Sequence, residues 1–511
     1  MKREQAAYFP PITLAAGGTV PLYRQLYEWF RAAILDGQLH PGQVVPSTRS
    51  LALELCISRA PVLSAYELLH AEGYLETRTG AGTRVAIALP KDLARLSRHK
   101  SRKSEMRGSP APPRVARRAR AGRTQWEAPW TRHLGAFQFG SPAHEAFPAR
   151  IWASLLARNT RGSTAGIGSY VGGGRYLSAM GYVALREVIA EYLGTTRSMR
   201  CDPEQIMICQ GTRHGLHIAA SALLEEGDAV WMEDPGFWCA SDVFSSAGAR
   251  LVAVPVDASG LNVSEGMRRG PDARAVYVTP SHQFPMGYVM SLTRRLQLLD
   301  WAARRRAWIL EDDYSSEHRF AGPPIASLHG LDVNDRVIYF GTFSKVILPG
   351  VHLGYIVIPA ALVPAFKFVR QTIDEYSPAV FQTTLTDFIR EGHFARHIRR
   401  TKALYVKRRE ALIAALNEYL GDEFPVISTD AGMHLVLLLP PGPKDVELSK
   451  DLAEIGISAV PLSTCYLRRP GRNGLLLGYG NVDVGQMRES VARLAGVLRV
   501  ALARDRALSA I

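Results

Sequence analysis

Apolar residues at the beginning of the chain recur at the spacing of an amphipathic helix. Leu22, Leu26 and Phe30 lie about one helical turn apart, and Gly37 follows as a stop signal. The pattern therefore predicts a helix that buries one face and ends before Gly37.

Two shorter helices are predicted next. Ser47 is placed to cap the first, and Ser58 is placed to cap the second after a turn at residues 56–57. The second helix carries an apolar stripe made of Val62, Ala65, Tyr66 and Leu69. Two short helices joined by a tight turn are typical of a helix-turn-helix, whose second helix places its N-terminal end in the major groove of DNA.

The stretch YLETRTGAGTRV, residues 74–85, alternates in polarity around a Gly-rich turn and predicts a two-stranded wing. With the preceding helices it indicates an α+β winged helix-turn-helix. We expect this DNA-binding domain to occupy residues 1–88.

From about residue 135 the pattern changes, and short apolar runs alternate with amphipathic helical stretches. The strand-like runs include QIMIC, AVWME, AVYVTP, AWILEDDY, RVIYFGTF and LGYIVIP. Such alternation predicts an α/β domain with a mainly parallel sheet covered by helices on both faces. We expect this body at residues 135–511, with a smaller α+β subdomain from about residue 390 to the end.

The chain of 511 residues is too long for one ordinary domain, and a multidomain protein is expected. We find no apolar run of roughly 18 residues and no apolar signal segment after the first Met, which predicts a cytoplasmic protein without a membrane span. The five cysteines are widely spaced without a CxxC pair, which favours structural thiols and no metal site.

A cluster of basic residues marks the boundary between the predicted DNA-binding domain and the α/β body. The net charge is +14, and residues 91–123 hold twelve Lys or Arg against two acids, a local charge of about +10. This stretch is rich in Ser, Pro and Ala and has no apolar periodicity. We predict a basic, disordered linker over residues 89–134. It is either a solvated tether or a polycation that raises non-specific affinity for DNA phosphates.

Several strand ends in the body carry chemically active side chains. Asp312 and Tyr314 are two residues apart after an apolar run and should point the same way from an extended backbone. Lys345 follows another strand and is preceded by the hydroxyls of Thr342 and Ser344. Because ligands bind at the carboxyl ends of parallel strands, these residues are candidates for one site.

Two further strand ends complete a set of binding groups. In CQGTRHGL, a helix opens at Gly211, Thr212 and Arg213, where free amides and the helix dipole favour an anion. Phe237 follows the strand AVWME. Together the strand ends offer an amine, a carboxylate, a phenol, a phosphate cradle and an aromatic ring, which is the set that pyridoxal 5′-phosphate (PLP) requires.

Residues 20–88 resemble the GntR family of winged helix-turn-helix domains. The matching stretches are GQLHPGQVVPSTRSLA, ISRAPVLSAYELLHAEGYL and RTGAGTRV, in that order. The resemblance implies that six residues face DNA: Arg49, Ser58, Arg59, Arg78, Gly82 and Thr83. Pro61 stands where the family usually has Thr, which removes a hydroxyl that could contact phosphate.

The body resembles a fold-type I, class I aminotransferase, and the whole chain resembles the MocR/GabR-type regulators. The resemblance implies that Lys345 holds the aldehyde of PLP, that Asp312 bonds the pyridine nitrogen and that Tyr314 bonds the 3′-oxygen. It further implies that Phe237 stacks on the ring. The phosphate would be surrounded by Gly211, Thr212, Arg213 and Thr342.

Two other stretches match the family near the cofactor. Tyr176 in YLSAMG would reach the phosphate of the partner subunit, which implies a head-to-tail homodimer with shared sites. His282 in TPSHQFPMG would lie in the loop beside the cofactor ring, although Met286 replaces the usual Thr.

The sequence departs from the family at two positions. His352 stands where the family has an arginine for the phosphate, and Leu476 stands where it has the arginine that binds a substrate carboxylate. Arg472, four residues before Leu476, is the alternative carboxylate partner. We hypothesise that Arg213 supplies the phosphate charge that His352 lacks; the alternative is that Arg213 faces solvent.

These observations predict a PLP-dependent transcription regulator that binds a double-stranded DNA operator and senses PLP or an amino compound. The missing carboxylate partner favours a subgroup resembling PdxR, which senses PLP and controls vitamin B6 synthesis. A working aminotransferase with an appended DNA-binding domain is the alternative, and we expect at most weak transaminase activity. A DNA-binding protein with an empty body conflicts with the intact set of Asp312, Tyr314 and Lys345.

Overall fold

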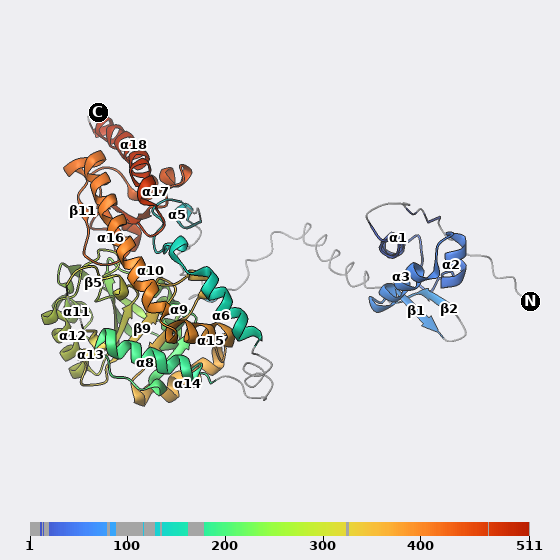
Figure 1. The fold of residues 1–511 in the computed structure, drawn as a ribbon, viewed down its shortest axis with the longest axis horizontal. Coiled ribbons are helices and arrows are strands. Elements are labelled where there is room, and N and C mark those ends of the chain that lie inside the picture. Colours follow the sequence, from blue (N-terminus) through green and yellow to red (C-terminus); the bar gives the residue numbers. More distant parts are fainter. Residues whose placement is uncertain are drawn as a thin grey trace, which may run out of the picture. The chain divides into compact units, whose positions relative to one another are not determined.

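The chain forms two compact units, Met1–Arg114 and Val115–Ile511, in a computed structural model (Figure 1). The structure describes the following residues: 11–12, 14, 20–78, 82–87, 116, 128–132, 135–161, 178–322, 326–468 and 470–509. Most of the linker expected at residues 89–134 lies outside them. Among the described helices, none combines the length and apolar character that a membrane span requires.

The N-terminal unit, called the head below, is a three-helix winged domain. Its elements are α1 (Leu22–Leu35), α2 (Thr48–Glu54), α3 (Arg59–Ala71), β1 (Leu75–Arg78) and β2 (Gly82–Val85), and the two strands pair antiparallel. The predicted stripe of α3 is buried against α1 in one apolar core. Ser47 caps α2 by accepting a hydrogen bond from the Ser50 amide at 3.1 Å. Ser58 precedes α3, but its side chain makes no capping hydrogen bond.

An eight-stranded sheet forms the centre of the second unit, called the body below. Its strands, in spatial order, are β3 (Ile206–Cys209), β10 (Gly354–Val357), β9 (Val337–Thr342), β8 (Trp308–Asp313), β7 (Ala275–Val278), β4 (Ala229–Asp234), β5 (Arg250–Asp257) and β6 (Gly260–Leu261). The central pairs from β9 to β5 are parallel, whereas β10 runs antiparallel to both of its neighbours and β6 is antiparallel to β5. The sheet is therefore mixed, with the predicted parallel arrangement at its centre.

Helices cover both faces of this sheet. One face packs against α9 (Gly211–Leu223), α10 (Trp238–Ser246) and α14 (Val363–Ile373). The other face packs against α6 (Ala149–Arg161), α8 (Val183–Arg197), α11 (Val263–Arg269), α12 (Leu292–Arg305), α13 (Leu328–Leu331) and α15 (Ala379–Arg390). Because strand side chains alternate, each central strand contributes buried residues to both faces, which explains why the strand runs in the sequence are almost entirely apolar.

A smaller subdomain is built around a four-stranded antiparallel sheet in the order β11 (Val426–Ile427), β12 (His434–Leu438), β14 (Gly474–Gly478) and β13 (Val460–Pro461). It also contains α16 (His393–Leu420), α17 (Asp445–Glu454) and α18 (Val484–Ser509). The long helix α16 packs against α15 of the large subdomain and against α18 of the small one, so it joins the two cores (Figure 1).

The body begins earlier than the sequence pattern suggested. Residues 128–132 fall inside the predicted linker, yet Pro129–Arg132 form helix α5 and Trp130 is only 7% exposed. The Trp130 indole packs into an apolar cluster with Trp238 and Leu476. The expectation of disorder fails for these residues because one large aromatic side chain finds a buried place, although the preceding sequence is basic.

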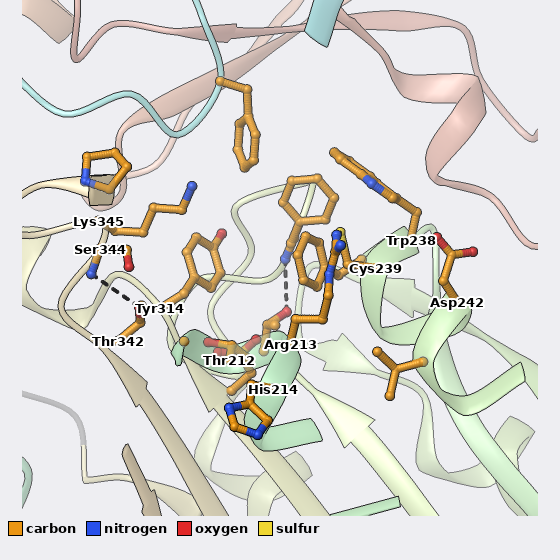
Figure 2. Close-up of a pocket in the computed structure, with 18 of the residues that line it drawn as sticks. Thr212, Arg213, His214, Trp238, Cys239, Asp242, Tyr314, Thr342, Ser344 and Lys345 are labelled. Carbon is orange, nitrogen blue, oxygen red and sulfur yellow. Dashed lines mark hydrogen bonds between the residues drawn. The ribbon is translucent and has the colours of Figure 1, made fainter. Parts of the chain in front are cut away.

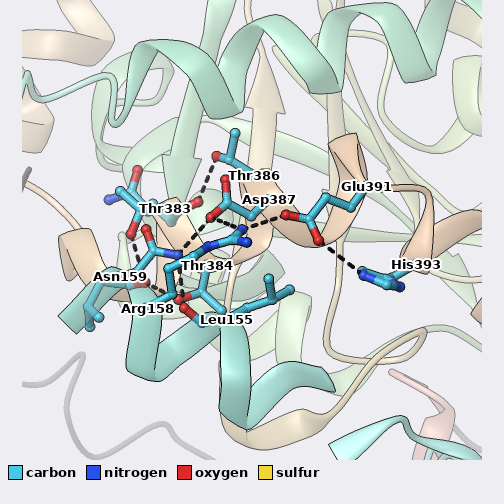
Figure 3. A network of polar contacts seen from close by, with 11 residues as sticks. Leu155, Arg158, Asn159, Thr383, Thr384, Thr386, Asp387, Glu391 and His393 are labelled. Carbon is cyan, nitrogen blue, oxygen red and sulfur yellow. Dashed lines mark hydrogen bonds and ion pairs between the residues drawn. The ribbon is translucent and has the colours of Figure 1, made fainter. Parts of the chain in front are cut away.

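A polar network fastens α6 to α15 on one face of the body (Figure 3). Arg158 pairs with Asp387 at 2.8 Å and with Glu391 at 2.5 Å, and the Asn159 amide donates to Asp387 at 2.8 Å. Arg158 is largely exposed, so water screens these ion pairs and we expect them to add little to the stability of the fold. The contact fixes the position of α6 rather than forming a binding site.

Candidate cofactor site

A cavity of about 1080 Å³ lies at the carboxyl ends of β7, β8 and β9, where the large and small subdomains meet (Figure 2). Nine of the residues predicted to bind the cofactor line it: Lys345, Asp312, Tyr314, Thr342, Gly211, Thr212, Arg213, Phe237 and His352. Tyr176, the residue predicted to reach the partner subunit, lies outside the described residues. The strand ends identified in the sequence are thus brought to one place by the topology of the sheet.

Lys345 lies in the turn after β9 and extends into this cavity. Its Nζ donates a hydrogen bond to the Gly140 carbonyl at 3.2 Å and lies 5.4 Å from the centre of the Phe139 ring. Burial lowers the pKa of the Lys345 amine, although Cys239 and Asp312 partly oppose this shift. A lysine whose pKa is lowered by burial loses its proton more easily, which is what a lysine that attacks an aldehyde requires.

Asp312 presents a carboxylate oxygen that has no hydrogen-bond partner among the described residues. Its Oδ2 accepts a hydrogen bond from the Tyr277 hydroxyl at 2.7 Å, whereas Oδ1 is buried and accepts none from the described residues. Burial raises the pKa of Asp312 to about 7. Because a buried acceptor without a partner is costly, Oδ1 is suited to a ligand that brings its own N–H donor.

Tyr314 follows β8, and its hydroxyl is hydrogen-bonded to His282. His282 Nε2 donates to the Ala431 carbonyl at 2.9 Å, so Nδ1 is left to accept the Tyr314 hydroxyl proton at 3.0 Å. Burial lowers the pKa of His282 to about 4, which keeps the ring neutral near pH 7. His282 is not among the described residues that line the cavity. Any effect of His282 on a bound cofactor would therefore act through Tyr314.

The start of α9 forms the end of the cavity that suits an anion. The chain turns directly from β3 into α9 through Gly211, whose φ of +75° is readily adopted only by glycine. Opposite it, the Ser344 amide donates to Thr342 Oγ1 at 3.2 Å, and the Ser344 hydroxyl is buried without a hydrogen-bond partner in the described chain. Free helix amides and an unpaired hydroxyl are groups that bind phosphate oxygens.

Two basic side chains stand at this end. Arg213 lines the cavity beside Cys239 of α10 (Figure 2), and its Nη2 donates to Cys239 Sγ at 3.0 Å. His352 has a left-handed backbone, with φ +47°, and its ring lies against Gly211. The contact with Cys239 directs the Arg213 side chain along the cavity wall. The assignment of Arg213 as the phosphate cation stays a prediction.

The side chain predicted at the carboxylate position contributes to an apolar wall. Leu476 is fully buried in β14, where it is paired with Val436 and Val460 on the neighbouring strands. Arg472, the alternative carboxylate partner, is exposed and is not among the described lining residues.

Sequence reasoning missed several residues of the site. Tyr277 holds Asp312, but in the run AVYVTP it could not be distinguished from an ordinary core residue. Trp130, Phe139 and Gly140 come from the segment that leads into the body, and no periodic pattern marks them. The alternation of side chains along the strand was the one available signal for Tyr277, since it lies beside Asp312 on the neighbouring strand β7.

The residues predicted to face DNA lie at three places in the head. Arg49, Ser58 and Arg59 are exposed at the N-terminal ends of α2 and α3, and Arg59 Nε donates to Thr48 Oγ1 at 3.1 Å. The wing places Gly82, with φ +77°, at the start of β2 and Thr83 next to it. The Arg78 side chain lies outside the described residues. The Thr48–Arg59 contact, which sequence reasoning missed, joins the two helix ends that suit phosphate contacts.

Comparison with known proteins identifies both parts. The family model for aminotransferase class I and II matches residues 156–494, and the model for bacterial regulatory proteins of the gntR family matches residues 22–85. A solved archaeal alanine:glyoxylate aminotransferase superimposes with a TM-score of 0.69 and 25% identity, over 76% of this chain and 98% of its own. A GntR-type head fused to an aminotransferase-like body defines a class of bacterial transcription regulators.

Full-length relatives narrow the class. The probable rhizopine catabolism regulatory protein MocR of Rhizobium meliloti is 38% identical over 98% of this chain and 99% of its own length. The pyridoxine biosynthesis regulator PdxR of Corynebacterium glutamicum is 30% identical over 95% and 98%. The chain belongs to the MocR-type transcription regulators.

Proposed function

We propose that the body of this regulator holds PLP on Lys345 and that the state of this site controls how the head binds a double-stranded DNA operator in the cytoplasm. The observation that carries the proposal is a set of polar atoms around one lysine whose hydrogen-bonding capacity is unsatisfied. Asp312 Oδ1 and Ser344 Oγ are buried without a hydrogen-bond partner in the part of the chain that the structure describes, and the Lys345 amine reaches into the same cavity.

These groups fit PLP one by one. Asp312 would accept the N–H of the pyridine ring, and the Tyr314 hydroxyl would bond the 3′-oxygen in place of its donation to His282 Nδ1. Ser344 and the amides at the start of α9 would hold the phosphate, while Phe237 at the start of α10 would cover the ring. When bound, PLP supplies an aldehyde that reacts reversibly with primary amines. The protein contributes the binding, the orientation and the exclusion of water.

The effector is PLP itself or an amine that competes with Lys345. The first choice makes the chain a regulator of vitamin B6 synthesis and is supported by the full-length similarity to PdxR. A weak aminotransferase activity is the second candidate, because the body shares its fold with solved aminotransferases. It is disfavoured by Leu476, which places no cation at the expected carboxylate position. A head-to-tail homodimer that shares its sites through Tyr176 is part of the proposal.

Covalent fixation tests the cofactor assignment. Purified protein should be yellow with bound PLP, and borohydride should attach PLP permanently to Lys345. Lys345→Ala should abolish the attachment, because the amine is lost. Lys367→Ala, at an exposed position of α14, is the matched control and should leave it unchanged. A label that stays on the protein in Lys345→Ala would place the cofactor elsewhere.

Operator binding tests the regulatory part. Titration with PLP, with and without amino compounds, should shift the affinity for operator DNA, and Lys345→Ala should remove the shift. Arg59→Ala should weaken operator binding by about 1–3 kcal/mol and relax its specificity if Arg59 reads a base, whereas Arg49→Ala should weaken all sequences alike. Operator affinity that ignores PLP at every concentration would contradict the proposal.

A further inference from the structure

The cavity has one wall that is apolar and aromatic. Five described residues from separate parts of the body form it: Trp130, Phe139, Trp238, Phe284 and Val460. The Phe139 and Phe284 rings meet edge to face at 5.1 Å, and Trp238 and Phe284 do so at 5.3 Å. Leu476 packs into the same cluster. In Figure 2, Trp238 lies well away from Thr342 and Ser344, the residues of the predicted phosphate end.

Positive charges in the described lining come from the other side. The basic residues there are Lys345, Arg213, His214, His217 and His352, which lie on α9 or in the segment after β9. None comes from α5, β13 or β14 in the described part of the chain. The guanidinium of Arg213 already donates to Cys239 Sγ at 3.0 Å. A carboxylate placed against the wall would lose its water without gaining a basic partner from the small subdomain.

The polar groups of the described lining near the wall are neutral or acidic, since Asp242 of α10 lies beside Trp238 (Figure 2). Gln138 and Thr131 line the cavity beside the aromatic rings, and they can offer hydrogen bonds but no charge. Desolvating an unpaired carboxylate is expensive, whereas an apolar or aromatic group gains both burial and ring contacts. The wall therefore favours an amine that carries an apolar or aromatic group and disfavours an amine that also carries a carboxylate.

We propose that the effector of this regulator is a primary amine that lacks a carboxylate and has an apolar, preferably aromatic, body. This inference rests on the proposed function, because it requires PLP on Lys345 to capture the amine. The phosphate end and Lys345 fix the cofactor, and the apolar wall selects what reaches it. Amino acids of the same size are rejected because their carboxylate meets this wall.

Matched ligand pairs test the selection. PLP-loaded full-length protein is titrated with 2-phenylethylamine and with L-phenylalanine, which differ by one carboxylate, and in parallel with butylamine and L-norvaline. The readouts are the visible absorbance of PLP, the tryptophan fluorescence of the wall and operator binding. Each amine should half-saturate the response at a concentration lower than that of its amino acid by about tenfold or more. Equal or tighter binding of the amino acids would overturn the inference.

Variants at Leu476 sharpen the test. Leu476→Arg introduces a guanidinium into the apolar cluster behind the wall and should reverse the preference within each pair. Leu476→Met, which keeps the volume and the apolar character, should preserve it. Circular dichroism checks that Leu476→Arg is folded, and the ligand pairs on the parent protein decide the matter if it is not.

The failures are distinguishable. A protein that does not bind PLP on Lys345 removes the proposed function and the inference together. A protein that binds PLP and changes its operator affinity with PLP, but responds to no amine, overturns only the inference.

Discussion

Two neighbouring carboxylates at the end of β8 are both buried, yet their surroundings differ. Asp313 faces α8, where its Oδ2 accepts from Arg197 at 2.7 Å and from the Tyr339 hydroxyl at 2.6 Å. Asp312 faces the cavity, where its only described hydrogen bond comes from the Tyr277 hydroxyl. The guanidinium compensates the charge of Asp313, and no basic side chain within hydrogen-bonding distance does the same for Asp312.

This difference separates a structural charge from a binding group. A buried ion pair ties its elements together, here the end of α8 and the edge of the site strand. A buried carboxylate without a cation has a raised pKa, which is a property of a site that a ligand completes. An oxygen without a described hydrogen-bond partner does not separate the two carboxylates, because Asp313 Oδ1 has none either. The sheet places one kind on each face because side chains alternate along β8.

Removing the cation that pairs with Asp313 should have the largest effect on the stability of the protein. Arg197→Met leaves Asp313 buried without its cation and should lower the free energy of unfolding by about 3–5 kcal/mol. Denaturant unfolding of the isolated protein measures this loss. Arg304→Met removes an exposed ion pair with Asp300 and should cost about 1 kcal/mol or less, which makes it the control. A loss for Arg197→Met no larger than this control would remove the distinction.

Asp312→Asn should have the opposite sign in PLP-free protein. The pKa of Asp312 is raised from 3.8 to about 7, so the folded state keeps a proton that the unfolded state releases. The parent should therefore lose stability as pH rises from about 4 to 7, while the variant lacks this loss. Above pH 7 the variant should be more stable by on the order of 4 kcal/mol. Asp313→Asn, which strands Arg197, should instead destabilise at every pH. Melting curves across this range decide between the two signs.

A smaller effect, on the affinity for PLP, is expected at the phosphate end of the cavity. Arg213→Gln should weaken PLP binding by about 1.5–3 kcal/mol, because a charge-assisted hydrogen bond to phosphate is lost. Adding His352→Arg to that variant should restore the affinity, since position 352 adjoins the same helix start. Equilibrium dialysis of PLP measures both. PLP affinity that is unchanged in Arg213→Gln would assign Arg213 to the cavity wall alone.

The sequence predicted those parts of the site that follow a period. Asp312, Tyr314 and Lys345 could be recognised because parallel strands end at one edge of a sheet and strand side chains alternate. The buried stripe of α3 in the head could be recognised because its apolar residues recur at helical spacing. Tyr277 could not, because a tyrosine inside an apolar strand has the same pattern whether it supports a carboxylate or fills a core. Trp130, Phe139 and Gly140 could not either, because their positions depend on the path of an irregular segment.

The hydrogen bond between Lys345 and Gly140 connects the cavity to the segment that leads into the body. Gly140 has φ +69°, and a Cβ at this position would collide with Lys345 Nζ, so the backbone here is shaped around the amine. Helix α5, with Trp130 in the cavity wall, comes shortly before Gly140 in the sequence. When the lysine amine is engaged by a ligand, the hydrogen bond to the Gly140 carbonyl is given up. A ligand on Lys345 would therefore act first on the segment of the body around Gly140, which follows the predicted linker in the sequence.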